Sequence, residues 1–122
     1  MTLLTSAKSV LPAALCLAFL VLSPAVHAQN ASEQAYTCTP AGVAVFPQRV
    51  HVRCAQPVQG FTYFALNVNS AAHTQRVLTL LESALAGGRK IVVWSDLKDT
   101  SGAAIGCQVN DCRLMSSVEV LR

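Results

Sequence analysis

Polar and apolar residues alternate strictly over residues 49–54, which read RVHVRC. A period of two residues is typical of a strand that buries one face and leaves the other in water. The buried face would carry two valines and a cysteine. The outer face would carry Arg49, His51 and Arg53.

Four further segments combine β-branched or aromatic residues with turn-forming residues at their ends, as strands do. The segment FTYFALNV is the most apolar of them and is expected to be the most buried. The predicted strands are residues 43–46, 61–68, 91–94 and 117–121.

One helix is predicted between the third and fourth strands. Asn69 or Ser70 would cap its beginning, and the pair Gly87 and Gly88 would end it. Apolar residues recur there at spacings of three and four, which is the pattern of a helix with one buried face. This stripe consists of Val77, Leu80, Leu81, Ala84 and Leu85.

The order of three strands, one helix and two strands limits the fold. A small sheet cannot bury both of its faces, and one helix covers only one side or end of it. We therefore predict an all-β fold with one helix: a small five-stranded β-barrel of the OB (oligonucleotide/oligosaccharide-binding) type, with the helix between strands 3 and 4. The alternative is an open antiparallel sheet packed on one helix.

The first 28 residues have the pattern of a secretory signal peptide. Lys8 is followed by an apolar run over residues 10–22, and Val26 and Ala28 stand at the positions that a signal peptidase reads. The run is shorter than the roughly 20 residues that span a membrane. We predict cleavage after Ala28, a single domain over residues 29–122, and a periplasmic or secreted bacterial protein.

Four cysteines remain once Cys16 leaves with the signal peptide, and an even number in a short exported chain indicates disulfides. Three pairings are open. Loop lengths favour Cys38 with Cys54 and Cys107 with Cys112, and we predict these two bonds. A zinc site is the alternative, but it usually brings two closely spaced pairs of ligands where this chain has one.

Composition and motifs indicate a binding protein in preference to an enzyme. Without Lys8 the chain keeps eight basic and six acidic residues, a balance too weak to predict a nucleic-acid or membrane partner. No serine lies in a nucleophile motif, and His51 and His73 have no metal ligand at a suitable spacing. Asp96 and Asp99 lack the alternation of a calcium loop. We therefore predict no catalytic residue, no metal and no cofactor.

The outer face of the alternating strand is the one candidate ligand face. Arg49, His51 and Arg53 could meet a phosphate or a sulfated sugar there. The simpler interpretation is a solvated strand surface.

Cysteine spacing and element order together resemble a known family. Fifteen residues separate Cys38 from Cys54, the helix ends in glycine, and Gly106 precedes a late C-x₄-C. In these features the chain resembles the B subunits of bacterial toxins related to subtilase cytotoxin and typhoid toxin. Residues 63–66 and 107–113 resemble small exported proteins of proteobacteria more closely.

This resemblance implies an OB-fold barrel, a ring of five subunits and a cell-surface glycan as ligand. The sugar-gripping serine of the toxins lies in a longer segment before the first cysteine, and nothing aligns Ser32 with it. The glycan site is therefore not carried over. Our main hypothesis is an exported module that binds a glycan or a protein. The alternative is a stand-alone periplasmic accessory protein that binds an envelope protein and has no glycan site.

Overall fold

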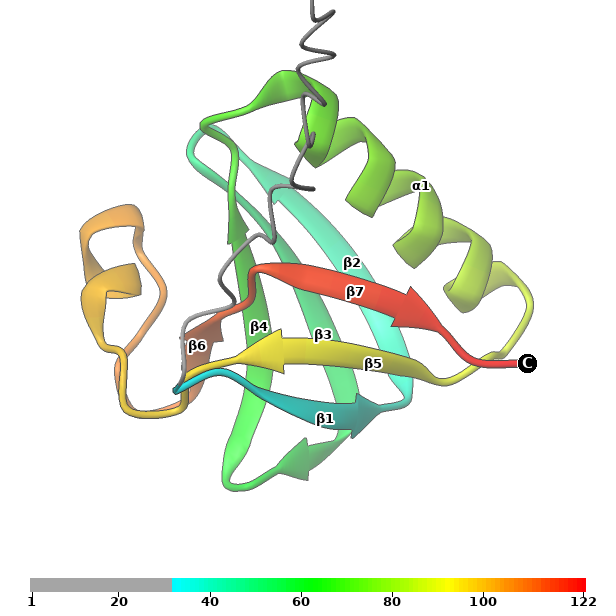
Figure 1. Ribbon diagram of the computed structural model, residues 1–122, viewed down its shortest axis with the longest axis horizontal. Coiled ribbons are helices and arrows are strands. Elements are labelled where there is room, and N and C mark those ends of the chain that lie inside the picture. Colours follow the sequence, from blue (N-terminus) through cyan, green and yellow to red (C-terminus); the bar gives the residue numbers. More distant parts are fainter. Residues whose placement is uncertain (1–31) are drawn as a thin grey trace, which may run out of the picture.

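The computed structural model describes residues 32–122, so the predicted signal peptide, its cleavage site and Cys16 lie outside the described residues. Seven strands, one long helix and one 3-10 helix follow one another along the chain (Figure 1). They are β1 (Gln34–Cys38), β2 (Pro40–Phe46), β3 (Arg49–Val58), β4 (Phe61–Asn67), α1 (Ala71–Ala86), β5 (Ile91–Ser95), η1 (Ser101–Ile105), β6 (Cys112–Leu114) and β7 (Ser117–Val120).

The strands form two sheets. One has the order β2-β3-β4-β6 and the other the order β1-β5-β7. All neighbours are antiparallel except β4 and β6. The strands of the two sheets cross steeply (Figure 1). Thr39 alone separates β1 from β2, and only Met115 and Ser116 separate β6 from β7. The chain therefore passes from one sheet to the other at two short corners.

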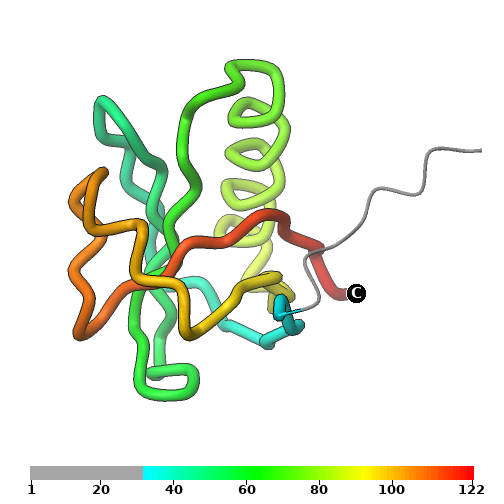
Figure 2. Tube along the Cα trace, turned by 60° about the vertical axis from the view of Figure 1, so that its left-hand side comes forward, coloured from blue at the N-terminus to red at the C-terminus, as the bar shows by residue number. Residues whose placement is uncertain are grey.

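The core lies between the two sheets and α1. Val50, Val52 and Cys54 of β3 are all at most 3% exposed, which confirms the alternation predicted for this strand. The helix contacts β2 in one sheet and β7 in the other, and it covers the gap between these two edges (Figures 1 and 2). Among the described residues, no helix is long and apolar enough to span a bilayer.

The ends of α1 follow from its capping residues. The Ser70 hydroxyl accepts a hydrogen bond from the backbone N–H of His73, and Gly87 is the C-cap. Of the predicted stripe, Val77, Leu81 and Ala84 are buried, while Leu80 and Leu85 are 40% and 38% exposed. The buried face is therefore narrower than the sequence pattern suggested.

The prediction of a mostly β fold with one helix is confirmed, but five strands were expected and the described residues contain seven. The helix consequently follows the fourth strand. β1 and β6 were missed because the first is largely polar and the second has only three residues. β3 continues past Cys54 to Val58 through an irregularity in its pairing with β4. Strand pairing within residues 32–122 does not join the two sheets into one closed barrel.

Both predicted disulfides are present. Cys38–Cys54 joins the end of β1 to β3, with 5.5 Å between the Cα atoms, and so ties the two sheets together beside the corner at Thr39. Cys107–Cys112 closes the segment in front of β6, with 5.2 Å between its Cα atoms. All four cysteines are buried.

Replacing both members of the first bond, C38A with C54A, should lower the free energy of unfolding by about 2–5 kcal/mol. The loss has two sources, since the bond restricts the unfolded chain and the two sulfur atoms fill the core. Urea unfolding of the oxidised protein measures it. An unchanged midpoint with an unchanged slope would show that the bond does not hold the sheets together.

Candidate functional site

The outer face of the four-stranded sheet brings the predicted ligand face together with aromatic side chains. Arg49 of β3 is paired in register with Phe46 of β2, and Arg53 is paired with Tyr63 of β4. His51 lies between the two arginines on the same face. Phe46 is 39% exposed, so this face carries aromatic as well as polar side chains.

Residues 96–111, the segment between β5 and β6, form a wall beside this face. Cys107 and Cys112 pack against Ala65 of β4 in a small second cluster, with Tyr63 and Leu114 at its border. The wall and the strands enclose a pocket of about 290 Å³. Its lining consists of Phe46, Arg49, His51, Tyr63, Gly106, Gln108, Asp111 and Cys112.

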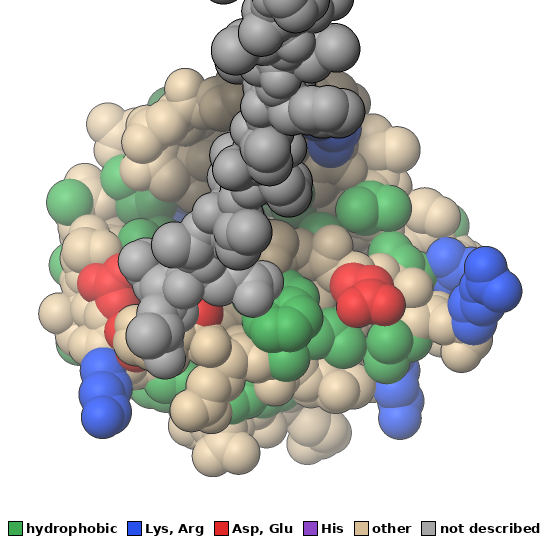
Figure 3. All heavy atoms as spheres, viewed as in Figure 1, with side chains coloured by type: hydrophobic (Ala, Val, Ile, Leu, Met, Phe, Trp, Pro, Cys, Tyr) green, Lys and Arg blue, Asp and Glu red, His purple; other side chains and the backbone are tan. Residues whose placement is uncertain are grey.

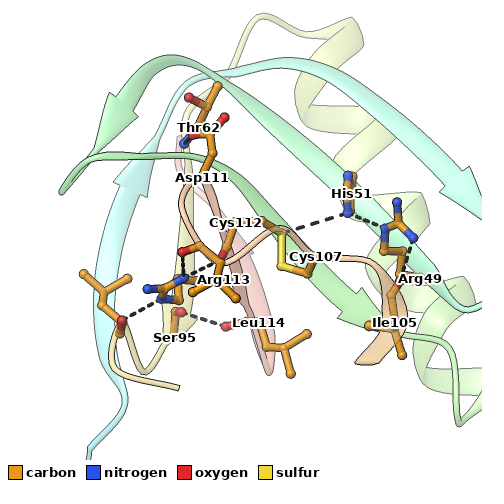
Figure 4. Close-up of a disulfide and its surroundings, with 12 residues drawn as sticks. Arg49, His51, Thr62, Ser95, Ile105, Cys107, Asp111, Cys112, Arg113 and Leu114 are labelled. Carbon is orange, nitrogen blue, oxygen red and sulfur yellow. Dashed lines mark hydrogen bonds between the residues drawn. A yellow bond between two sulfur atoms is a disulfide. The ribbon is translucent and has the colours of Figure 1, made fainter. Parts of the chain in front are cut away.

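Arg49 connects the sheet to the wall. Its Nε donates to Nε2 of His51 at 2.6 Å, and its Nη1 donates to the carbonyl oxygen of Ile105 at 2.5 Å (Figure 4). The guanidinium carbon lies 4.1 Å from the centre of the Phe46 ring, within cation–π distance. Three neighbours from three elements therefore fix the guanidinium group.

Gly106 makes the approach of Arg49 to the wall sterically feasible. It is the C-cap of η1 with a φ of 84°, a conformation that side-chain-bearing residues rarely adopt. A Cβ atom at this position would lie 2.5 Å from Nη1 of Arg49.

The surroundings of His51 lower its pKa and so favour the neutral imidazole. Burial lowers its pKa from the usual value of 6.5, and the neighbouring Arg49 charge lowers it further. Because Nε2 accepts from Arg49, the ring proton is assigned to Nδ1. Nε2 also lies 4.0 Å from the Cys112 sulfur. Nδ1 is thus the donor of the imidazole, and Nε2 is its acceptor for Arg49.

Arg113, which is only 8% exposed, holds the wall in place through hydrogen bonds to backbone carbonyls. Its Nε donates to the carbonyl of Leu97 at 2.6 Å, and Nη1 donates to the carbonyls of Val109 and Cys112 at 2.6 and 2.7 Å (Figure 4). The guanidinium also lies 4.0 Å from the centre of the Phe61 ring. Arg113 therefore ties the two ends of the wall to each other.

Asp111 fastens the wall to the sheet. Its Oδ1 accepts from the backbone N–H of Thr62 at 2.8 Å, and its carbonyl accepts from the N–H of Tyr63. Both bonds join residues almost fifty positions apart in the sequence. They place one carboxylate on the rim of the pocket.

The three predicted ligand-face residues do share one surface, and two of them line this pocket. Arg53 lines a neighbouring hollow of about 400 Å³. Sequence reasoning missed Phe46, Tyr63, Gln108 and Asp111 as lining residues and Arg113 as the support of the wall. The sequence signals in this region were the predicted Cys107–Cys112 bond and the resemblance noted for residues 107–113.

Basic side chains also gather away from this pocket. On the face that carries β5 and β7 they cluster at the right of the view (Figure 3). Arg89, Lys90 and Arg122 line one hollow of about 300 Å³. No group of three or more His, Cys, Asp or Glu side chains between residues 32 and 122 is arranged to hold a metal ion.

Comparison of the chain with protein-family models, with curated proteins and with solved structures finds no match. The toxin-like ring and the glycan ligand implied by the resemblance therefore stay predictions.

Substituting Gly106→Ala should destabilise the protein more than Gly60→Ala. Both glycines have a φ near 90°, but nothing lies within 4 Å of a Cβ at Gly60. The G60A variant therefore measures backbone strain alone, about 1 kcal/mol. G106A should cost at least about 1 kcal/mol more, because it also breaks a charged hydrogen bond of Arg49. Equal costs in urea unfolding would show that Arg49 is not held at the wall.

The stability of the protein should depend on the protonation of His51. Its pKa is lower in the folded state, so neutral His51 stabilises the fold fully above about pH 6.5. That contribution is lost as the pH falls from this value toward the folded-state pKa. The difference in unfolding free energy between wild type and H51Q, measured from pH 8 to pH 4.5, isolates the effect. A pH-independent difference would contradict it.

Proposed function

We propose that this chain is an exported, disulfide-stabilised binding module that holds a glycan in a groove over β3. The groove consists of the pocket at Arg49 and the neighbouring hollow at Arg53. One observation carries the proposal: a partly aromatic pocket, fixed by Arg49 and the disulfide-closed wall, lies on an otherwise ordinary sheet surface. The proposal requires no catalytic group, metal or cofactor.

The polar groups of the pocket suit sugar hydroxyls, which both donate and accept hydrogen bonds. Arg49 and Nδ1 of neutral His51 supply donors, and the rim carboxylate of Asp111 supplies an acceptor. The amide of Gln108 and the phenol of Tyr63 can do either. A few polar groups of mixed type in an otherwise apolar pocket are usual in small-ligand sites.

Preorganisation supports the same conclusion. Arg49 is fixed by two hydrogen bonds and the Phe46 ring, and the wall is fixed by Arg113 and a disulfide. Binding then immobilises few protein side chains, which removes part of the usual entropic cost.

We further propose that the two sheets are the halves of an OB-type barrel. If β1 with β2, and β6 with β7, each count as one bent strand, the chain has five strands. Strand pairing then gives two runs, β2-β3-β4-β6 and β7-β5-β1, and the two short corners of the chain connect these runs into a cycle. In OB folds the ligand lies on the face of the second and third strands, between loops, which is where this groove lies.

Export is part of the proposal. Two disulfides in a chain of this size suit an oxidising compartment. The signal-peptide pattern of residues 1–28 points the same way.

A glycan array probed with the exported, oxidised protein tests the function, and R49Q is the informative variant. Arg49→Gln should weaken every specific signal at least tenfold, because a hydrogen bond to a charged group contributes about 1.5–3 kcal/mol. Arg76→Gln is the control, since Arg76 is exposed on α1 away from the groove. Circular dichroism shows whether both variants fold.

A flat array would contradict glycan binding. If a periplasmic crosslinking experiment then captured one envelope protein through the groove, the accessory-protein hypothesis would replace it. An R49Q signal equal to that of wild type would place the glycan site elsewhere.

A further inference from the structure

We propose that the groove continues along β3 into a second subsite at Arg53 and that its ligand is a linear acidic polysaccharide. This inference rests on the proposed glycan function and adds the class of glycan. It also distinguishes an extended chain from a single terminal sugar.

The two hollows on this face form one cleft. The pocket at Arg49 and the hollow at Arg53 share three lining residues: Phe46, His51 and Tyr63. Arg49 and Arg53 are four residues apart on one strand, which corresponds to about 13 Å at 3.3 Å per residue. That distance spans several sugar units. A ligand that reaches both arginines is therefore an extended chain lying along β3.

The positive charge of both arginines is available to a ligand. Arg49 donates to His51 and to the Ile105 carbonyl, and Arg53 donates to the carbonyl of Ala41 at 3.2 Å. Within residues 32–122, neither guanidinium bonds a carboxylate. Each guanidinium has five N–H donors, so most of them are left for an external acceptor. Two guanidinium groups in one cleft favour a ligand with a repeated acidic group.

The one carboxylate in the cleft does not neutralise these charges. Asp111 lies at the wall end and accepts from the backbone of Thr62. It would repel an acidic group placed beside it and accept a hydroxyl instead. The polarity of the cleft therefore also requires a ligand in which hydroxyls accompany the acidic groups, as they do in sugars.

Single-stranded nucleic acid fits the cleft less well. Its bases would have to stack on exposed rings, an interaction of about 1–3 kcal/mol per base. Here Arg49 lies over the Phe46 ring, and His51 lies between the rings of Phe46 and Tyr63, with centroid distances of 5.1 and 5.7 Å. Arg49 therefore occupies one face of the Phe46 ring, and His51 separates the two aromatic rings, so they do not form a continuous stacking platform.

An acidic peptide in extended form also fits less well. Such peptides usually add to the free edge of a sheet through main-chain hydrogen bonds. β3 has no free edge along the cleft, because it is paired with β2 on one side and with β4 on the other.

Oligogalacturonates of defined length are the probe for this proposal, and their methyl esters are the matched neutral control. Affinity for the exported, oxidised protein, measured by calorimetry, should rise from the disaccharide to the tetrasaccharide and then level off. R53Q should reduce the rise in affinity with oligosaccharide length at least tenfold. R76Q, which removes the same charge from α1, should keep the wild-type length dependence. Esterification should weaken the hexasaccharide at least tenfold.

The outcomes separate this inference from the proposed function. If neutral glycans bind, R49Q weakens them and R53Q has no effect at any length, the module binds glycans but the acidic second subsite is refuted. If no oligogalacturonate or ester binds while the glycan array still gives specific signals, the acidic-polysaccharide inference is refuted and the glycan function stands; a flat array as well refutes both. If single-stranded DNA of equal charge binds as tightly as the hexasaccharide, the cleft recognises polyanions generally and the polysaccharide proposal is overturned.

Discussion

The register of β3 is the constraint on which both the core and the groove depend. Its side chains alternate between Val50 and Val52, which have no exposed surface, and Arg49, His51 and Arg53 on the outside. A shift of one residue would bury two guanidinium groups and expose the valines, at a cost far above the stability of a small domain. The Cys38–Cys54 bond holds the same strand to the other sheet. The position of the candidate ligand face is thus fixed by the packing of the core.

The wall needs a different kind of support, because so small a domain has no spare core to bury it. The structure supplies this support with polar and covalent contacts. Arg113 bonds three carbonyl oxygens, Asp111 bonds the backbone of β4, and the Cys107–Cys112 bond closes the segment between them. A buried guanidinium is costly when its donors lack partners, and here carbonyls accept from Nε and Nη1 of Arg113 without a counter-charge. Arg113 does not line the pocket or the neighbouring hollow, whose basic side chains are Arg49 and Arg53.

The sequence predicted the structural features that are encoded by residues close together in the chain. The alternation of β3, the Ser70 cap, the glycine stop and both disulfides are each visible within short stretches of the chain. What it did not predict depends on distant pairs. Arg49 meets Ile105 across 56 positions and Thr62 meets Asp111 across 49, and no local pattern announces either contact. Tyr63 was expected in a buried strand, yet its side chain borders the groove, because it alternates with the fully buried Phe64 and so lies on the outer face of β4. β6 was invisible because three residues are too few to show a period.

The two arginines of the cleft differ in how far the fold explains them. Arg49 has a structural role, since it links β3 to the wall, and a lysine or a neutral donor could not copy its fork of hydrogen bonds and its place over Phe46. Arg53 has one bond of 3.2 Å to a carbonyl and lies exposed on a strand whose position is already fixed by its buried face. Folding therefore accounts for Arg49 even if no ligand exists, whereas it gives little reason for a cation at position 53. The case for an acidic ligand accordingly depends more on Arg53 than on the better-ordered Arg49.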